Sequence, residues 1–187
     1  MIEKKMPVIL LIGESGSGKN TVQDELERLY GCVPLLSYTT RPKRTPNENT
    51  HTFVTEEEFD KILKNEKVIA FTRFDEHRYC ATDKQLEQSD VYIIDAAGLQ
   101  TLLELKTNKE IDIPFVAFYL QVPEEERIKR MRKRGDSERA IKQRIEHDRI
   151  AFQRASELCE YTIDNIDSIA TAKMIYSYVY DVVMKNN

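Results

Sequence analysis

The sequence is poor in the residues that mark several common classes of protein. Its three cysteines, Cys32, Cys80 and Cys159, are odd in number, widely spaced and form no Cys-x-x-Cys pair, so neither a disulfide framework nor a zinc site is predicted. Reduced thiols suit the cytosol. The polar residues 1–5 and the short apolar run at residues 8–12 match neither a signal peptide nor a membrane span. We therefore expect a cytoplasmic protein with no membrane partner.

An excess of charge of one sign is also lacking. The 187 residues carry a formal net charge of −4, which argues against a nucleic-acid partner. A hydrophobic content of 41% in a chain of this length suits one well-packed domain with small appended pieces. The sequence contains no internal repeat and no low-complexity tract, and it leaves a monomer and a homodimer equally open.

Short apolar segments alternate with segments of helical periodicity. The predicted strands cover residues 6–12, 32–36, 67–74, 91–94, 115–122 and 161–163. The predicted helices cover residues 21–30, 55–63, 99–105, 124–134, 138–158 and 170–183. This alternation predicts an α/β protein with a parallel sheet flanked by helices. Residues 37–81 form the exception, because they read as a strand-rich insertion with one helix.

Glycine is scarce, and half of it is concentrated in one loop. Three of the six glycines fall within six positions, between the first predicted strand and the first predicted helix. Backbone N–H groups can surround a diphosphate only where glycine dihedrals are available and no Cβ intervenes, and the following helix adds its N-terminal dipole. With Lys19 reaching the outer phosphates, the loop predicts binding of ATP by Gly13, Ser15, Gly16, Ser17, Gly18, Lys19, Asn20 and Thr21.

The magnesium ligand usual in such loops is altered. The pattern places Ser or Thr after the lysine, where the hydroxyl binds Mg²⁺, whereas this chain has Asn20, with Thr21 one position further on. We expect Mg²⁺ to be held mostly by phosphates and water, with no dedicated metal site in the protein. Asp95, at the end of a predicted buried strand, is the best-placed carboxylate to hold the ion indirectly. Its alternative role is to cap the helix that follows.

A first basic cluster lies in a proline-bearing loop. Arg41, Lys43 and Arg44 occupy three of four positions with no acidic residue among them. Two guanidinium groups suit the geometry of one phosphate group better than lysine does. We predict that this loop holds the phosphate of a small phosphorylated acceptor.

A second basic cluster spans residues 127–149, where much of the charge is expected to be solvated. Phosphoryl transfer needs cations around the spreading negative charge, often on a mobile segment. We predict Arg130, Arg134 and Arg144 as the functional members. No catalytic base is required, because a phosphate oxygen is already ionised at neutral pH and attacks once it is aligned. Among the scattered histidines, only His51 lies near the first basic loop.

Several segments, in chain order, resemble the guanylate kinase family. Residues 13–19 resemble its phosphate loop, and residues 37–44 are similar to its S-x-T-T-R-x-x-R segment. Further matches are with its F-V-x-x-x-E-F run, its I-D-x-Q-G strand end, its lid arginines and its adenine-side loop, at residues 53–59, 94–98, 130–144 and 163–165. Together they cover nearly the whole chain and are far more specific than the loop alone.

The resemblance implies a P-loop kinase with three parts, which transfers a phosphoryl group from ATP, with Mg²⁺, to GMP or dGMP. The parts would be a core at residues 1–36, 82–124 and 146–187, an acceptor-binding subdomain at 37–81 and a lid at 125–145. The implied acceptor-binding residues are Ser37, which would face the base, with Arg41, Arg44, His51, Tyr79 and Asp95. Lys19 and the arginines Arg130, Arg134 and Arg144 would surround the transferring group, and Asn165 would lie near adenine.

The base-binding half of the site departs from the family. The family places a glutamate that accepts hydrogen bonds from guanine in the strand where this chain has Ala70. Its Y-G-[ST] becomes Tyr79-Cys80-Ala81, and His51 stands where a phosphate-contacting tyrosine is expected. Each guanine donor left unpaired would cost about 1–3 kcal/mol. Either another carboxylate, such as Asp75 or Glu76, compensates, or guanine is not the base.

Two other functions fit parts of the pattern. A kinase of the same fold that acts on a phosphorylated sugar, such as ribose 1,5-bisphosphate, would need the phosphate contacts but no base carboxylate, which Ala70 allows. Domains like guanylate kinase also serve as non-catalytic protein-binding modules. The intact loop at residues 13–19 and the lid arginines argue against that last function.

Overall fold

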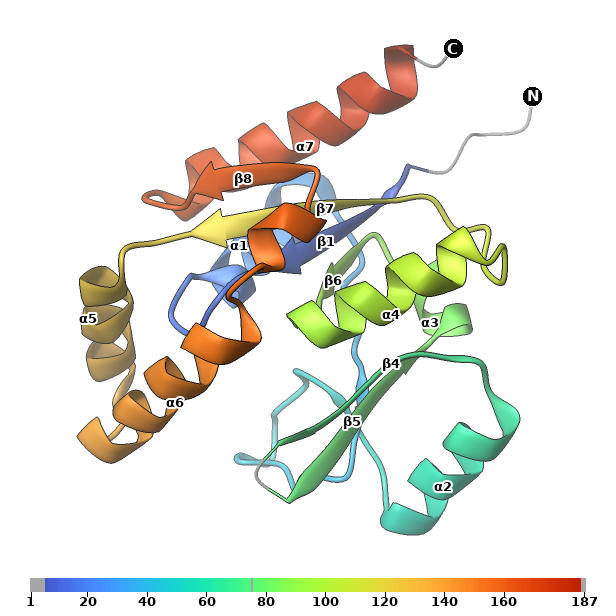
Figure 1. Cartoon of the computed structure of the whole chain (residues 1–187), viewed down its shortest axis with the longest axis horizontal. Coiled ribbons are helices and arrows are strands. Elements are labelled where there is room, and N and C mark those ends of the chain that lie inside the picture. The colour runs from blue at the N-terminus through green and yellow to red at the C-terminus, as the bar shows by residue number, and fades with distance from the viewer. Residues whose placement is uncertain (1–5, 75, 186–187) are drawn as a thin grey trace.

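The computed structural model describes residues 6–74 and 76–185, which form two sheets with helices around them (Figure 1). The first sheet has four parallel strands in the order β6-β1-β7-β8. These strands are β1 (Val8–Ile12), β6 (Val91–Ile93), β7 (Phe115–Gln121) and β8 (Tyr161–Asp164). The parallel sheet predicted from the alternating pattern is therefore confirmed.

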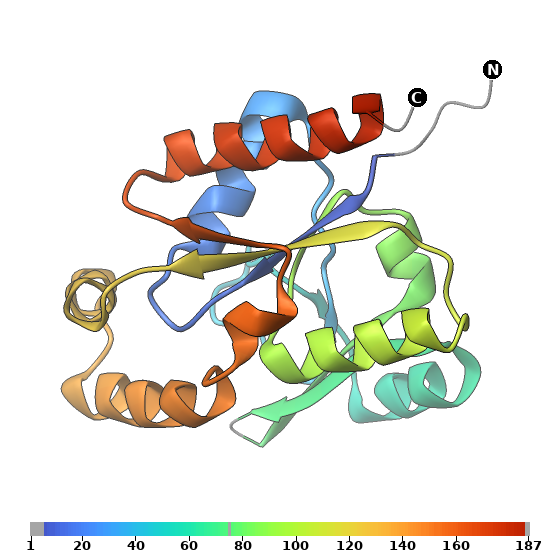
Figure 2. The same ribbon diagram turned by 45° about the horizontal axis from the view of Figure 1, so that its top comes forward.

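Different helices cover the two faces of this sheet because successive strand residues point to opposite sides. From β1, Ile9 and Leu11 pack with α1 (Lys19–Tyr30) and α7 (Ser168–Lys185). Leu10 and its neighbours pack on the other face with α4 (Ala96–Thr107). Figure 2 shows α1 and α7 together on one side of the strands and α4 on the other. Burial on both faces explains why β1 reads as a continuous apolar run.

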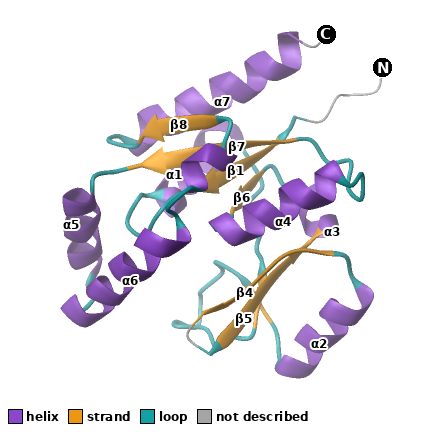
Figure 3. Cartoon of the chain, viewed as in Figure 1, coloured by secondary structure: helices purple, strands orange, loops and turns teal. Residues whose placement is uncertain are grey.

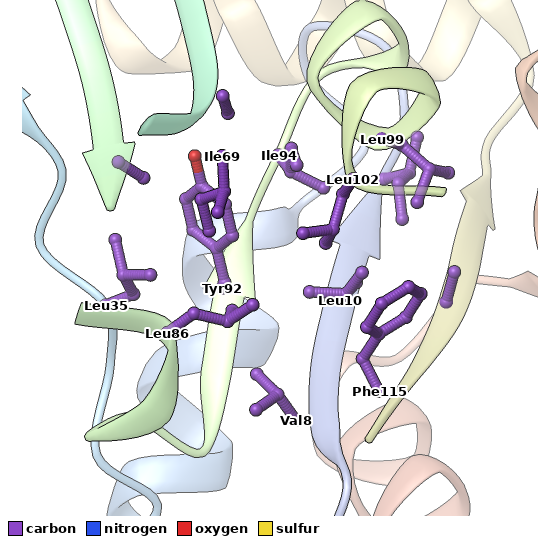
Figure 4. Close-up of a cluster of buried hydrophobic side chains, with 14 of the residues drawn as sticks. Val8, Leu10, Leu35, Ile69, Leu86, Tyr92, Ile94, Leu99, Leu102 and Phe115 are labelled. Carbon is purple, nitrogen blue, oxygen red and sulfur yellow. The ribbon is translucent and has the colours of Figure 1, made fainter. Parts of the chain in front are cut away.

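The larger apolar cluster lies between the two sheets (Figure 4). Leu10 and Phe115 come from the parallel sheet, Leu99 and Leu102 from α4, and Ile69 from the second sheet, and all five are buried. Because one cluster takes side chains from both sheets, the second sheet is fixed against the first. A small cavity lined by residues of both sheets becomes part of the site.

The second sheet is built from residues 38–82 and has the strand order β3-β2-β5-β4. Its strands are β2 (Tyr38–Thr39), β3 (Thr52–Phe53), β4 (Val68–Phe74) and β5 (His77–Thr82), accompanied by α2 (Glu56–Asn65) and α3 (Asp83–Glu87) (Figure 3). Thr55 begins α2 with the predicted capping box, in which its hydroxyl accepts from the Glu58 N–H and the Glu58 side chain accepts from the Thr55 N–H.

Two charged helices, α5 (Glu124–Arg134) and α6 (Glu138–Ala151), follow β7 and meet at Gly135. Gly135 ends α5 with a φ of 96°, a conformation in which glycine has no Cβ penalty. Met131, Ile141 and Ile145 form a small apolar cluster between the two helices. The short 3₁₀ helix η1 (Ala155–Leu158) then leads to β8.

Some sequence-based element predictions were wrong. The strand predicted at residues 32–36 is reduced to a single bridge between Pro34 and Val91, because proline lacks the N–H that a strand ladder needs. The helix predicted at 138–158 ends at Ala151, where Phe152 and Ala155 turn into the cluster beneath α4. The strands β2, β3 and β5 and the helix α3 were not predicted. Within the described residues, no helix has the length and apolar character needed to cross a membrane.

Candidate active site

The loop between β1 and α1 has the backbone shape that the sequence predicted. Gly16 and Gly18 have φ values of 80° and 90°, which side-chain-bearing residues rarely adopt. A Cβ on Gly16 would lie 2.7 Å from the carbonyl oxygen of Arg127, and one on Gly18 would lie 2.6 Å from Nδ2 of Asn165. The loop therefore packs closely against α5 on one side and against the segment after β8 on the other.

Lys19 begins α1 with its ammonium group folded over the loop. Its Nζ donates to the carbonyl oxygens of Gly13, at 2.5 Å, and Glu14, at 3.1 Å. Burial lowers the pKa of Lys19 to about 8, while the nearby carboxylate of Asp148 acts in the opposite direction. The lysine is thus held where negative charge would stabilise its protonated form.

A large cavity of about 970 Å³ opens on the helix side of the loop. Its walls carry an excess of cations, including the predicted Arg130, Arg134 and Arg144. Asn20, Thr21, Ile166 and Ser168 also line it. The predicted loop residues Ser15, Gly16, Gly18 and Lys19 contribute the floor.

A small cavity of about 260 Å³ lies on the other side of the loop, between the two sheets. The predicted acceptor-binding residues Ser37, His51, Tyr79 and Asp95 all line it, as does Ala70. Ser37 Oγ and His51 Nδ1 lie 3.0 Å apart. Burial, followed by the charge of Arg41, lowers the pKa of His51, so the imidazole is neutral at neutral pH.

The two cavities meet at the phosphate loop. Ser15 and Lys19 line both of them. A group bound in the large cavity and a group bound in the small one would therefore approach each other beside the Lys19 ammonium. This is the arrangement that direct transfer of a phosphoryl group between two bound molecules requires.

The two arginines of the first basic loop are placed differently. Arg41 is nearly buried and directs its guanidinium to Glu48, with hydrogen bonds of 2.7 and 3.2 Å. Arg44 lines the large cavity, and its backbone N–H donates to Glu48 at 2.6 Å. The structure therefore brings Arg44 to the side where Arg134 and Arg144 lie. Arg41 lies beside Tyr79, which lines the small cavity, but Arg41 itself is not among the residues that line either cavity.

The arginines of α5 and α6 are engaged with carboxylates in this structure. Arg134 forms an ion pair with Asp136, and Arg144 Nε lies 3.9 Å from the same carboxylate. Arg130 donates to Glu126 and to the carbonyl oxygen of Asn165. A bound phosphate would compete with these carboxylates for the guanidinium groups.

Asn165 and Asp95 have clear structural contacts. Asn165 is buried and donates through Nδ2 to the carbonyl oxygen of Ser17 at 2.7 Å, while its Oδ1 is buried with no hydrogen-bond partner among the described residues. Its contact with adenine remains a prediction. Asp95 caps α4 by accepting from the Gly98 N–H at 2.7 Å, which is the alternative role predicted for it. Asp95 also lines the small cavity.

Much of the wall of the small cavity is apolar. Ala70, Tyr92, Ile93 and Ile94 line it, with Asp95 as the acidic residue among the described lining residues. Asp75 lies outside the described residues. Glu76 is exposed at the turn between β4 and β5 and does not line the cavity, so it does not replace the missing glutamate at position 70.

Four charged residues of the site were not singled out from the sequence. Glu48 and Asp136 neutralise the predicted arginines, and Arg127 and Asp148 lie buried beneath the phosphate loop. The signal for the first pair was an acidic residue near each basic cluster, with Glu48 seven positions from Arg41 and Asp136 two positions from Arg134. Nothing in the local sequence marks Asp148, because its neighbour Ser15 lies 133 positions away.

A parallel sheet with a glycine-rich loop leading into a helix N-terminus defines the P-loop class of nucleotide-binding proteins. A family model described as "AAA domain" matches residues 9–151. Curated relatives include a guanylate kinase of Schizosaccharomyces pombe, 31% identical over 82% of this chain and 79% of the relative. Another, from Onion yellows phytoplasma, is 30% identical over 91% of this chain and 83% of the relative.

The solved structures agree with the sequence relatives. The crystal structure of guanylate kinase from Anaplasma phagocytophilum matches with a TM-score of 0.65 and 25% identity, over 95% of this chain and 87% of the other. A shikimate kinase from Acinetobacter baumannii shares the fold, with a TM-score of 0.50 at 15% identity. The chain belongs to the guanylate kinase family, which confirms the resemblance predicted from its motifs.

Proposed function

We propose that the protein transfers the γ-phosphoryl group of ATP to the phosphate of GMP or dGMP. The observation that carries this proposal is that Ser15 and Lys19 line both cavities. The large, cation-lined cavity suits the triphosphate, and the small cavity between the sheets suits a nucleoside monophosphate. Relatives named guanylate kinase over most of the chain support GMP as the acceptor.

The transfer step follows from this arrangement. An acceptor phosphate oxygen attacks the γ-phosphorus of ATP, the bond from that phosphorus to the β–γ bridging oxygen breaks, and ADP leaves with the electron pair. Lys19 stabilises negative charge on the β and γ phosphates, and Arg130, Arg134 and Arg144 stabilise the charge that spreads over the transferring group. Arg41, Arg44 and Tyr79 hold the acceptor phosphate in line. No side chain has to remove a proton.

Magnesium fits the large cavity beside the loop. Asn20 and Thr21 line it next to Lys19, and amide and hydroxyl oxygens are hard donors that suit this ion. Among the residues that the structure describes, no three His, Cys, Asp or Glu side chains gather as a metal-binding group. When bound, Mg²⁺ would be held by the phosphates and water with Asn20 and Thr21, and it would neutralise phosphate charge.

We infer a cytoplasmic location from the three free cysteines, because reduced thiols suit the cytosol.

The proposal is tested by measuring ADP release from ATP with a panel of acceptors: GMP, dGMP, AMP, CMP, UMP and ribose 1,5-bisphosphate. Turnover with GMP or dGMP above the other nucleotides is expected. Turnover with the sugar phosphate alone, or no turnover with any acceptor while ATP still binds, would overturn it. The Lys19→Ala variant serves as the control for contaminating kinases.

A further inference from the structure

Three charged side chains lie together beneath the phosphate loop, where the proposed transfer does not use them. This buried charge cluster consists of Glu14 in the loop, Arg127 in α5 and Asp148 in α6. Arg127 is 2% exposed and Asp148 is 4% exposed. Buried charges are costly unless they are paired and hydrogen-bonded, so their contacts indicate what they do.

Arg127 joins α5 to the loop. Its Nη2 lies 2.9 Å from Oε1 of Glu14, and its Nη1 donates to the carbonyl oxygen of Ser15 at 3.3 Å. Tyr119 in β7 contacts the other Glu14 oxygen at 3.4 Å. The backbone of Arg127 also packs where a Cβ on Gly16 would lie. One side chain therefore contacts two consecutive loop residues, and its backbone contacts the next.

Asp148 joins α6 to the same loop from the other helix. Its Oδ2 accepts from the Ser15 N–H at 2.6 Å and lies 3.7 Å from Nη1 of Arg127. The N–H of Ser15 thus donates to the carboxylate of Asp148, and the carbonyl oxygen of Ser15 accepts from the guanidinium of Arg127. Ser15 lines both cavities, so its backbone orientation determines the shape of the point where the two cavities meet.

We propose that Arg127 and Asp148 are positioning residues, which hold the backbone of Glu14 and Ser15 in the conformation that receives the triphosphate. Through this contact the loop is tied to the two helices that carry Arg130, Arg134 and Arg144. The inference rests on the proposed function for the identity of ATP as the triphosphate. A purely structural pair would be replaceable, because a buried ion pair can often be exchanged for neutral or apolar groups without loss of stability.

The electrostatic surroundings of Lys19 support the same role. The charged groups that face Lys19 are Glu14 from its own loop, Arg127 and Arg134 from α5, and Asp148 from α6. Of the two carboxylates, Asp148 is the stronger influence favouring the protonated lysine.

A charge-balanced double variant, Arg127→Met with Asp148→Asn, tests the proposal. It removes one positive and one negative charge, so the net charge near the loop is unchanged. We expect the melting temperature to stay close to that of the wild type and the dissociation constant for ATP, measured by calorimetry without acceptor, to rise about tenfold. The matched control is Arg132→Met with Glu138→Gln, an exposed ion pair between the same two helices, which should bind ATP like the wild type.

Two single variants at Asp148 supply a readout that a purely structural role would not move. Asp148→Asn keeps an oxygen that can accept from the Ser15 N–H, so it should bind ATP nearly as the wild type does, whereas Asp148→Leu cannot accept this hydrogen bond and should raise the dissociation constant about tenfold. This comparison also tests the proposal if the double variant does not fold. Wild-type ATP affinity in the double variant, or equal ATP affinity in Asp148→Asn and Asp148→Leu, would overturn the proposal. Since neither measurement includes an acceptor, both are independent of whether GMP is the substrate.

Discussion

Glu48 and Arg41 form a nearly buried, two-point ion pair in the loop that is proposed to hold the acceptor phosphate. The Arg41 Nη2 to Glu48 Oε1 distance is 2.7 Å, and the two side chains are 9% and 10% exposed. Glu48 also accepts from the Arg44 N–H at 2.6 Å and from the Thr50 hydroxyl at 2.9 Å. One carboxylate thus organises a loop that the sequence showed only as a cluster of cations.

Substitution of Glu48 should weaken acceptor binding selectively. In Glu48→Gln the side chain keeps its shape but loses the charge that orients Arg41, so the KM for the acceptor should rise about tenfold while the KM for ATP stays unchanged. Steady-state kinetics with each substrate varied in turn measures this. Glu157→Gln, which alters an exposed pair with Arg154, is the matched control. An unchanged acceptor KM would show that Arg41 needs no such partner.

The hydrogen bonds of Arg41 and of the Arg44 N–H lower the pKa of Glu48 from 4.5 to about 2. The carboxylate is therefore ionised throughout the range from pH 5 to 9, and the effect of Glu48→Gln on KM should be constant across it. A loss of the difference between wild type and variant as the pH rises within this range would contradict the assignment.

Lys19 should impose an alkaline limit on activity. Its pKa in the free protein is about 8, below the ordinary 10.5, so the charge that attracts phosphates is present below this pH and is lost above it. We expect kcat/KM for ATP to fall as the pH rises through about 8, since this parameter reports groups of the free enzyme. A profile that stays flat to pH 10 would show that Lys19 keeps its proton or is not needed.

Removal of the lysine side chain tests the placement of the phosphate loop itself. Lys19→Ala should lower kcat/KM at least about a hundredfold, because a preorganised cation at the transferring phosphate is lost. Its circular dichroism spectrum should match the wild type. Lys64→Ala, at the exposed end of α2, is the control and should behave as the wild type. Substantial activity in Lys19→Ala would mean that the triphosphate binds elsewhere.

Base recognition can be tested by restoring the family's carboxylate. Ala70 is buried at the wall of the small cavity, so Ala70→Glu places a carboxylate where guanine donors would otherwise lack a partner. The ratio of kcat/KM for GMP to that for AMP should rise about tenfold or more. Ala70→Gln, which has similar volume but no charge, should give a smaller increase. An unchanged ratio would show that the base does not lie against β4.

Much of the fold followed from local patterns in the sequence. The continuous apolar run of β1, the glycine-rich loop and the capping box at Thr55 each depend on residues close in the chain, and each formed as expected. The strand β5 was missed because its residues, His77 to Thr82, do not alternate clearly and depend on pairing with β4. Tertiary contacts also ended α6 earlier than its charged periodicity indicated.

The sequence predicted the motif residues of the candidate site but not the carboxylates that contact them. Ser37, His51, Tyr79 and Asp95 gather around one cavity, whereas Arg44 lines the other cavity and Arg41 lines neither. Their roles stay predictions. Glu48 and Asp136 lie close in the chain to the arginines with which they pair, but they were not predicted because only the cations of each cluster were considered. Asp148 was not predictable, since its contact joins distant segments. Asp148 reaches Ser15 across 133 positions, and the pattern around it reads only as an exposed charged helix.

We propose that the phosphoryl group passes directly between molecules bound in two cavities that meet at Ser15 and Lys19. The most direct test is a single-turnover reaction in which ATP labelled in its γ-phosphate is mixed with excess protein, GMP and Mg²⁺, and the labelled products are separated. We expect the label to appear in GDP, with no labelled inorganic phosphate formed first. Label found only in inorganic phosphate, or only in a sugar phosphate when ribose 1,5-bisphosphate is also supplied, would contradict it.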